Sequence, residues 1–249
     1  MVLMLLGAVA PFQSHAASVQ FPQLGVELAA VAPHADPDVI ALATRALACA
    51  NQSQFVRNPQ TLSVIDYSRP STQPRLWVFD LAQRRLLFEE LVAHGRNTGD
   101  NASIRFSNAP SSLMSSIGVF LTGNTYIGHN GYSLHLRGLD PGFNDNAFER
   151  AIVIHGAPYV DAALALSQGR LGRSFGCPAV RPAIARTLID TIRDGSLVVA
   201  YYPDKAWLRN SAFTQDCSVA ATEKAAAGNA MIARTIADTS ASWNRRSMP

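Results

Sequence analysis

Short runs of β-type residues, separated by turn residues, constrain the fold of this chain more than any other feature. Aliphatic and aromatic residues are concentrated in these runs, whereas Gly, Pro, Asn, Asp and Ser lie between them, as is typical of strands and turns. Seven runs fit this description: Leu62 to Tyr67, Arg75 to Asp80, Leu86 to Ala93, Ile117 to Thr122, Tyr132 to Arg137, Ala151 to His155 and Leu197 to Tyr202. They predict a mainly β domain with flanking helices, built as a β-sandwich or a partly closed barrel.

Two segments have a helical pattern instead. Asp36 before Pro37 is typical of a helix start, and apolar residues then recur at steps of three and four as far as Cys49. A second helix is expected to begin at Pro182 and to end at Gly195. We expect both helices to cover the β core.

The start of the chain resembles an export signal. Residues 2–10 form an apolar stretch of the length of a signal-peptide core, and Ser14-His15-Ala16 suits cleavage after Ala16, although no Lys or Arg precedes the stretch. The stretch is too short to span a bilayer. We therefore expect residues 1–16 to be a signal peptide, and the mature protein to be exported to the periplasm or cell envelope.

The length and composition of the chain suggest one domain with extensions at both ends. The chain has 249 residues, of which 48% are hydrophobic and 16% charged, which is ample for a sizeable core. Residues 17–35 are rich in Pro and Ala and lack a clear period, so we expect a linker there. The domain is expected over 36–217, with its motif-bearing core over 62–203, and a weakly structured tail over 218–249.

Charge and ligand spacing exclude two classes of function. The net charge is only +3, and no Lys/Arg cluster with interleaved aromatic residues suggests a nucleic-acid surface. No C-x-x-C or H-x-x-x-H spacing suggests a zinc site. We expect neither nucleic-acid binding nor a bound metal.

The three cysteines are expected to play different parts. In an oxidising compartment an odd number implies one thiol outside the pairing. A Cys49–Cys217 disulfide would tie both ends of the domain to its body and leave Cys177 free. The alternative is that Cys49 and Cys217 are two buried free thiols.

The stretch around Cys177 carries the chemistry. The apolar run before His155 fixes this imidazole on a strand, and a Gly-rich loop then leads to Ser174-Phe175-Gly176-Cys177. Such a loop can bring a thiol within hydrogen-bond reach of the imidazole, and a neighbouring imidazole can take the thiol proton and make the sulfur nucleophilic. Backbone N–H groups in the Ser174-Phe175-Gly176-Cys177 turn could stabilise the oxyanion of a tetrahedral intermediate, and Gly176 would let the backbone approach a substrate closely. Taken singly, a lone Cys is more often a buried small hydrophobe and a strand His a satisfied core group.

These residues resemble a known bacterial family. L,D-transpeptidases are marked by a His that is followed, after a loop, by Ser/Thr-His-Gly-Cys. The chain is more similar still to the murein L,D-transpeptidase catalytic-domain-like branch, with which it shares IVIHGAPYV over 152–160 and GRSFGCPAV over 172–180. The similarity covers 62–203, and Phe175 stands where the broader family has the second His.

The resemblance implies a reaction and its partners. Cys177 would attack a peptidoglycan stem peptide after an L-configured centre and form a thioester, and His155 would protonate the leaving amine. An amine acceptor would complete crosslinking or D-amino-acid exchange, whereas water would make the same site an L,D-carboxypeptidase. Carbapenems would acylate Cys177, and no cofactor or metal is implied.

Each supporting residue has a functional and a structural interpretation. The Gly156 carbonyl could orient the imidazole, or this glycine could serve close packing. Arg173 could bind a substrate carboxylate or pair with a surface acid, and Ser174 could act near the oxyanion or hold the turn. Tyr159 could wall the groove, although packing is the commoner role of such a residue. The remaining candidates, Tyr126, His94, His129 and His135, are expected to be structural or solvent-facing.

Two other classes of protein fit the sequence less well. Papain-like proteases place Cys before His, and caspases have His far upstream of Q-A-C, so neither fits a His155 that precedes Cys177 without those signatures. The second class is a non-catalytic wall-binding module that has lost its active site. Only Phe175, which replaces the second His of the broader family, favours it. It fits poorly with the presence of both His155 and Cys177.

Overall fold

The computed structural model describes residues 21–56, 59–215 and 217. Its helices are α1 (Phe21–Val31), α2 (Pro37–Gln52), α3 (Ala162–Gln168), α4 (Pro182–Ile192) and α5 (Lys205–Asn210). Its strands are β1 (Thr61–Asp66), β2 (Leu76–Asp80), β3 (Arg85–Glu90), β4 (Gly118–Gly128), β5 (Gly131–Gly138), β6 (Val153–Gly156), β7 (Ala179–Val180) and β8 (Leu197–Tyr201).

The strands form one mixed sheet in the order β3-β2-β1-β8-β4-β5-β6-β7. Pairing is antiparallel except between β1 and β8 and between β6 and β7. Just beyond β3, Ala93 bridges Ala179 of β7, with a 2.8 Å bond from the Ala93 N–H to the Ala179 carbonyl. The two edges of the sheet therefore meet, and the sheet is a nearly closed barrel, as the strand pattern predicts.

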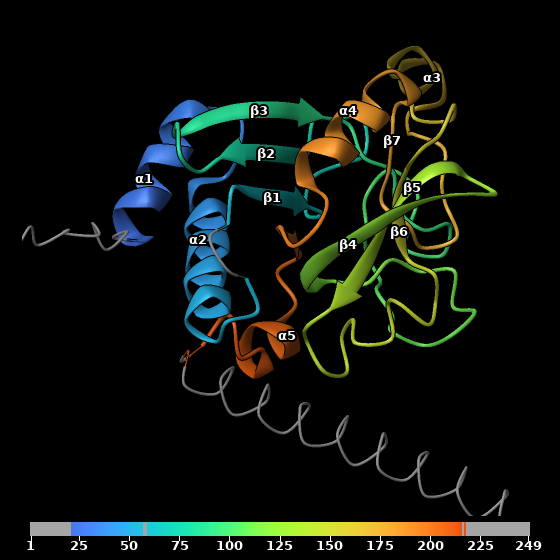
Figure 1. The fold of residues 1–249 in the computed structure, drawn as a ribbon. Coiled ribbons are helices and arrows are strands. Elements are labelled where there is room, and N and C mark those ends of the chain that lie inside the picture. Colours follow the sequence, from blue (N-terminus) through green and yellow to red (C-terminus); the bar gives the residue numbers. More distant parts are fainter. Residues whose placement is uncertain (1–20, 57–58, 216, 218–249) are drawn as a thin grey trace, which may run out of the picture.

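Helices α1 and α2 lie side by side against one part of this sheet, where α2 contacts β1 and β8 (Figure 1). The N-cap of α2 is Asp36, whose side chain accepts the Asp38 N–H at 2.8 Å, with Pro37 at the first helical position. The predicted helix start is thus confirmed.

Helix α1 lies within the segment for which the sequence predicts a linker, 17–35. Residues 21–31 are helical, and Leu24 and Leu28, one turn apart, are buried. The prediction of an irregular linker is wrong for these residues, because this apolar stripe packs against α2. Residues 17–20 lie outside the described part of the chain.

Helix α4 contacts β1, β5 and β6 and lies between the β1–β3 part and the β4–β7 part of the sheet (Figure 1). Its Leu188, Ile189 and Ile192 are fully buried, so this face of the helix packs on the sheet. Because α4 packs on β6, it supports the strand that carries His155.

All seven predicted runs are strands, with shifted ends. The largest difference is at β4, which continues through the polar stretch to Gly128 because it forms a hairpin with β5. Three short elements were not expected, namely β7, α3 and α5. The predicted signal peptide, 1–16, and tail, 218–249, lie outside the described residues.

Cys49 and Cys217 form a disulfide, and Cys177 is the free cysteine. The predicted pairing is therefore confirmed. The bond links α2 to the far end of the domain across a sequence separation of 168 residues. Among the described helices, none combines the length and apolarity needed to cross a bilayer.

Candidate active site

Strand pairing brings the two motif segments together. Strands β6 and β7 are parallel neighbours, with His155 opposite Ala179, and Cys177 precedes β7 by two residues. The chain between them includes α3 and returns to the same sheet edge. The sequence-predicted His155 and Cys177 therefore lie at one site, although 21 residues separate them in the chain.

The imidazole of His155 is held by its own strand. Its Nδ1 atom lies 3.0 Å from the Gly156 carbonyl oxygen, which can only accept, so Nδ1 carries the proton in the neutral ring. Nε2 is then an acceptor. Burial lowers the pKa of His155, against a smaller raising effect of the bond to Gly156, so the resting imidazole is neutral at about pH 7.

Gly156 serves both interpretations given for it. Its carbonyl orients His155, and a Cβ at this position would lie 2.8 Å from Cβ of Ala185 on α4. The strand and the helix therefore approach each other more closely than a side chain would permit. Gly156 contributes through its backbone.

The Cys177 thiol is nearly covered, with 8% exposure. Its Sγ donates to the Ala151 carbonyl at 3.6 Å, and within the described part of the chain no hydrogen bond joins Sγ to His155. Burial raises the pKa of Cys177, opposed by backbone hydrogen bonding and by Arg150. The resting pair is a neutral thiol beside a neutral imidazole, which differs from the expected hydrogen-bonded pair.

Ser174 fastens the turn that leads to Cys177. Its Oγ donates to the Cys177 carbonyl at 2.6 Å and accepts the Gly176 N–H at 3.0 Å. The Gly176 amide is thus bound to the Ser174 hydroxyl in this structure. Gly176 itself has φ +130°, a value that favours glycine, and its carbonyl accepts from Ser115 Oγ at 2.9 Å.

A pocket of about 210 Å³ opens on these groups. Most of the predicted site residues line it, together with two residues from the tip of the β4–β5 hairpin: His129, Asn130, His155, Tyr159, Arg173, Ser174, Phe175 and Cys177. Phe175 is 69% exposed at its rim, with the Arg96 guanidinium 6.0 Å from the ring centre. A substrate can therefore approach the sulfur from this side.

Two candidates in or near the pocket are held by the fold. Arg173 Nη1 donates to Asp100 Oδ1 at 2.7 Å, so in this structure it pairs with a surface acid. Tyr159 lines the pocket, and a Cβ at Gly172 would clash with its side chain, so it also packs closely on the loop.

The remaining histidines differ. His94 is buried and accepts at Nδ1 from the Arg75 guanidinium at 2.8 Å, which makes it structural. His135 stacks on Tyr126 with ring centres 4.4 Å apart. His129, expected to be structural or solvent-facing, lies in the pocket lining. The sequence signal for a binding surface at His129 is the Gly- and Asn-rich stretch before Gly131.

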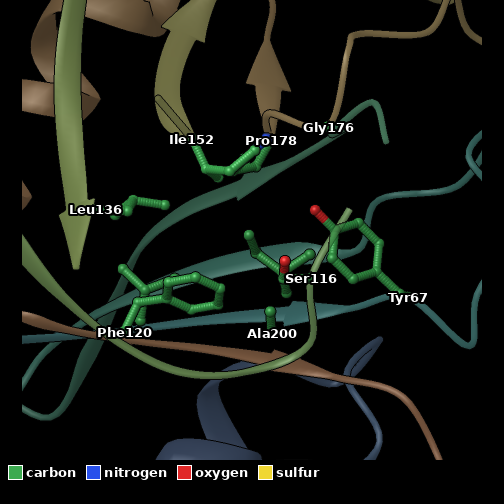
Figure 2. A pocket seen from close by; sticks show the side chains of 10 residues that line it. Tyr67, Ser116, Phe120, Leu136, Ile152, Gly176, Pro178 and Ala200 are labelled. Carbon is green, nitrogen blue, oxygen red and sulfur yellow. The ribbon is translucent and has the colours of Figure 1, made fainter. Parts of the chain in front are cut away.

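The turn rests on the barrel interior. A small cavity of about 10 Å³ lies beneath it, with Ile152, Gly176 and Pro178 along one side (Figure 2). The opposite side of this cavity includes Tyr67, Ser116, Phe120 and Ala200 (Figure 2). The residues that flank Cys177 therefore pack on the core, while the pocket lies on the outer side.

Sequence reasoning missed Arg150. Its guanidinium donates to the Ser107 carbonyl, Ser116 Oγ, Ser112 Oγ and the Met114 carbonyl. It also acts electrostatically on Cys177. No local pattern distinguished it from a surface arginine.

Among the described residues no group of three or more His, Cys, Asp or Glu is arranged to hold a metal ion.

The family is decided by a sequence match. A model of the L,D-transpeptidase catalytic domain matches residues 31–201, well over half of the chain. The chain belongs to this family. The matched range includes both His155 and Cys177. A search of curated proteins gives no match.

Solved L,D-transpeptidases are similar at low identity. One from Mycobacterium smegmatis is 13% identical, with a TM-score of 0.36, over 57% of this chain and 59% of that one. L,D-transpeptidase 3 from Mycobacterium tuberculosis, solved with a faropenem-derived adduct, is 14% identical, with a TM-score of 0.35, over 58% and 61%. One from Stackebrandtia nassauensis is 13% identical, with a TM-score of 0.34, over 74% and 92%. The match thus spans about three fifths of the two mycobacterial chains.

Proposed function

We propose that this protein is a cysteine-dependent peptidoglycan L,D-transpeptidase with Cys177 as nucleophile and His155 as base. The observation that carries the proposal is that a free thiol and an imidazole with an accepting Nε2 line one pocket, in a chain of this family. Substrate and reaction are those that the family implies, and both are open to test.

In the proposed acylation, the proton of Sγ moves to Nε2 of His155 as sulfur attacks the stem-peptide carbonyl after an L-centre. The tetrahedral oxyanion takes its hydrogen bonds from backbone N–H groups of the turn. The Gly176 amide is held by Ser174, so we assign the main role to the N–H of Cys177, which already lowers the pKa of its own sulfur. His155 then gives its proton to the leaving amine, and a thioester remains.

In the proposed second half, an acceptor amine enters the pocket and loses a proton to His155 as it attacks the thioester. The new amide forms, the C–S bond breaks, and the sulfur recovers a proton from His155. Water in place of the amine would give L,D-carboxypeptidase activity at the same residues. The carbonyl of Gly156 binds Nδ1 of His155, so that Nε2 remains the proton acceptor in both acylation and deacylation.

The test is muropeptide analysis of wall material incubated with purified full-length protein. We expect new crosslinked or exchanged products with the wild type and none with Cys177→Ala, while Thr187→Ala, at an exposed position of α4, behaves as wild type. Products shortened by one residue without crosslinks would indicate the carboxypeptidase. Identical chromatograms for wild type and Cys177→Ala on several wall types would refute both and leave a binding module.

Carbapenem acylation provides an independent test. One similar structure is a complex with the carbapenem imipenem, and another contains a faropenem-derived adduct; we propose that Cys177 reacts with carbapenems in this chain. Intact-mass spectrometry should show one adduct on the wild type and none on Cys177→Ala.

We also propose that the protein acts in the periplasm or cell envelope, where peptidoglycan is found. Cell fractionation would test this localisation.

A further inference from the structure

Arg150, in the turn before β6, is a partly buried cation without an acidic partner. All four of its hydrogen bonds go to neutral groups: Nη1 to the Ser107 carbonyl at 2.7 Å and Ser116 Oγ at 2.6 Å, and Nη2 to Ser112 Oγ at 3.0 Å and the Met114 carbonyl at 2.7 Å. Within the part of the chain that the structure describes, no carboxylate forms an ion pair with it. Its charge is therefore available to another anion.

This guanidinium lies against the residue that precedes the nucleophile. Its Nη2 is 3.5 Å from the point that a Cβ of Gly176 would occupy, and the Met114 carbonyl that it binds is 2.8 Å from the same point. The next residue, Ala151, has a φ of +53° and presents its carbonyl to Sγ of Cys177 at 3.6 Å. The Ala151 carbonyl therefore contacts the sulfur, and the Arg150 guanidinium lies against the residue before it in the chain.

The other titratable groups around the sulfur do not supply a positive charge to it. Burial raises the pKa of Tyr67 and of Tyr159 to about 12, so both are neutral at physiological pH. Burial lowers the pKa of His155, so its imidazole is neutral too. In the pocket lining, Arg173 is paired with Asp100, and His129 lies at the hairpin tip. Arg150 is the charged side chain that lowers the pKa of Cys177.

We propose that Arg150 is a positioning residue that provides the positive charge for the Cys177 thiolate, so that His155 acts as a neutral base and not as a standing imidazolium partner. The proposal rests on the proposed role of Cys177 as nucleophile. The guanidinium keeps its protons throughout. The thiol proton passes to Nε2 of His155, and the electron pair left on sulfur forms the new C–S bond. The substrate carbonyl takes up the negative charge.

The first test measures the rate of Cys177 alkylation by iodoacetamide against pH, which requires no turnover. Arg150→Gln and Arg150→Met should raise the thiol pKa, and alkylation at about pH 7 should slow roughly tenfold for every tenfold fall in the thiolate fraction. Arg150→Lys, which retains the charge, should restore most of the rate. The matched control is Arg193→Gln, a half-exposed arginine near the end of α4, which should titrate as the wild type does.

A variant of Ser112, a hydrogen-bond partner of Arg150, distinguishes the effect of the Arg150 charge from that of its hydrogen bonds. Ser112→Ala removes one of the four partners of Arg150 and keeps the cation, so the thiol pKa should stay at the wild-type value. Three results would overturn the proposal. The first is a thiol pKa that rises as much in Ser112→Ala as in Arg150→Gln, and the second is one that rises as much in Arg150→Lys as in Arg150→Gln. The third is a thiol pKa that does not rise in Arg150→Gln and Arg150→Met. Circular dichroism and thermal melting identify any variant that does not fold.

A measurement on the wild type decides the matter even if the neutral variants do not fold. The pKa of His155 is followed by NMR before and after Cys177 is blocked as the methyl disulfide. We expect this pKa to change little, because the resting imidazole has no thiolate partner. If the proton affinity of His155 instead falls by a factor of a hundred or more when Cys177 is blocked, the free enzyme holds an imidazolium–thiolate pair. That result would overturn the proposal. Either result stands whether or not the protein crosslinks peptidoglycan.

Discussion

The Nδ1 atom of His155 lies 3.0 Å from the carbonyl oxygen of Gly156, the next residue of the same strand. This bond fixes which nitrogen carries the proton, because a carbonyl can only accept. The base at the site is thus directed by the backbone, and no side chain is needed as a third member.

The pH dependence of the reaction should follow from this arrangement. Because burial lowers the pKa of His155 below its ordinary value of 6.5, the neutral base persists as the pH falls through that value. We expect the acid limb of a kcat/KM profile to lie below about pH 6.5. Measuring the profile in His129→Gln as well removes the other pocket histidine, and an acid limb at or above neutrality in both proteins would contradict the prediction.

Ser174 should affect catalysis through the shape of the turn. Ser174→Ala loses the bonds to the Cys177 carbonyl and the Gly176 amide, and at about 1 kcal/mol each we expect kcat/KM to fall roughly 30-fold. Ser174→Thr retains the hydroxyl and should recover most of the activity. Steady-state kinetics of both variants provide the measurement, and a Thr variant as poor as the Ala variant would show that the hydroxyl is not the cause.

Gly156 should be required for the packing of β6 on α4. A Cβ there would lie 2.8 Å from Ala185 Cβ, so we expect Gly156→Ala to cost about 1–3 kcal/mol of unfolding free energy. Ala185→Gly costs about 1 kcal/mol as a helical glycine but removes the clash. The double variant should therefore be more stable than the sum of the single effects, as measured by urea unfolding. Strict additivity would argue that the strand and helix do not meet here.

His94 should make the fold sensitive to acid. Burial, and then the charge of Arg75, lower its pKa to about 4, whereas the unfolded chain takes up the proton near 6.5. As the pH falls through this window, protonation favours the unfolded chain, and the buried neutral ring can account for about 3 kcal/mol of lost stability. We expect the stability difference between wild type and His94→Gln to shrink from about pH 7 to about pH 4. A difference that does not change with pH would contradict this.

Local sequence patterns predicted the strands, the two principal helices and the candidate catalytic pair. The seven β-type runs became strands because apolar and turn residues act within a few neighbours, and Asp36 caps α2 through its own adjacent backbone. His155 and Cys177 could be selected as candidates because the phrases around them, IVIHGAPYV and GRSFGCPAV, resemble those of a known family. The Cys49–Cys217 pairing was predicted because an odd number of cysteines leaves one thiol unpaired and Cys177 lies in the loop near His155.

Tertiary structure alone decided the surroundings of these groups. The burial of α1, the bridge between Ala93 and Ala179 and the pairing of Arg173 with Asp100 join segments that are far apart in the chain. Arg150 became a neighbour of the residue before Cys177 for the same reason, since the parallel pairing of β6 and β7 places the turn before β6 beside the loop that precedes β7. A local pattern carries no information on such contacts, because their geometry depends on how the whole barrel closes.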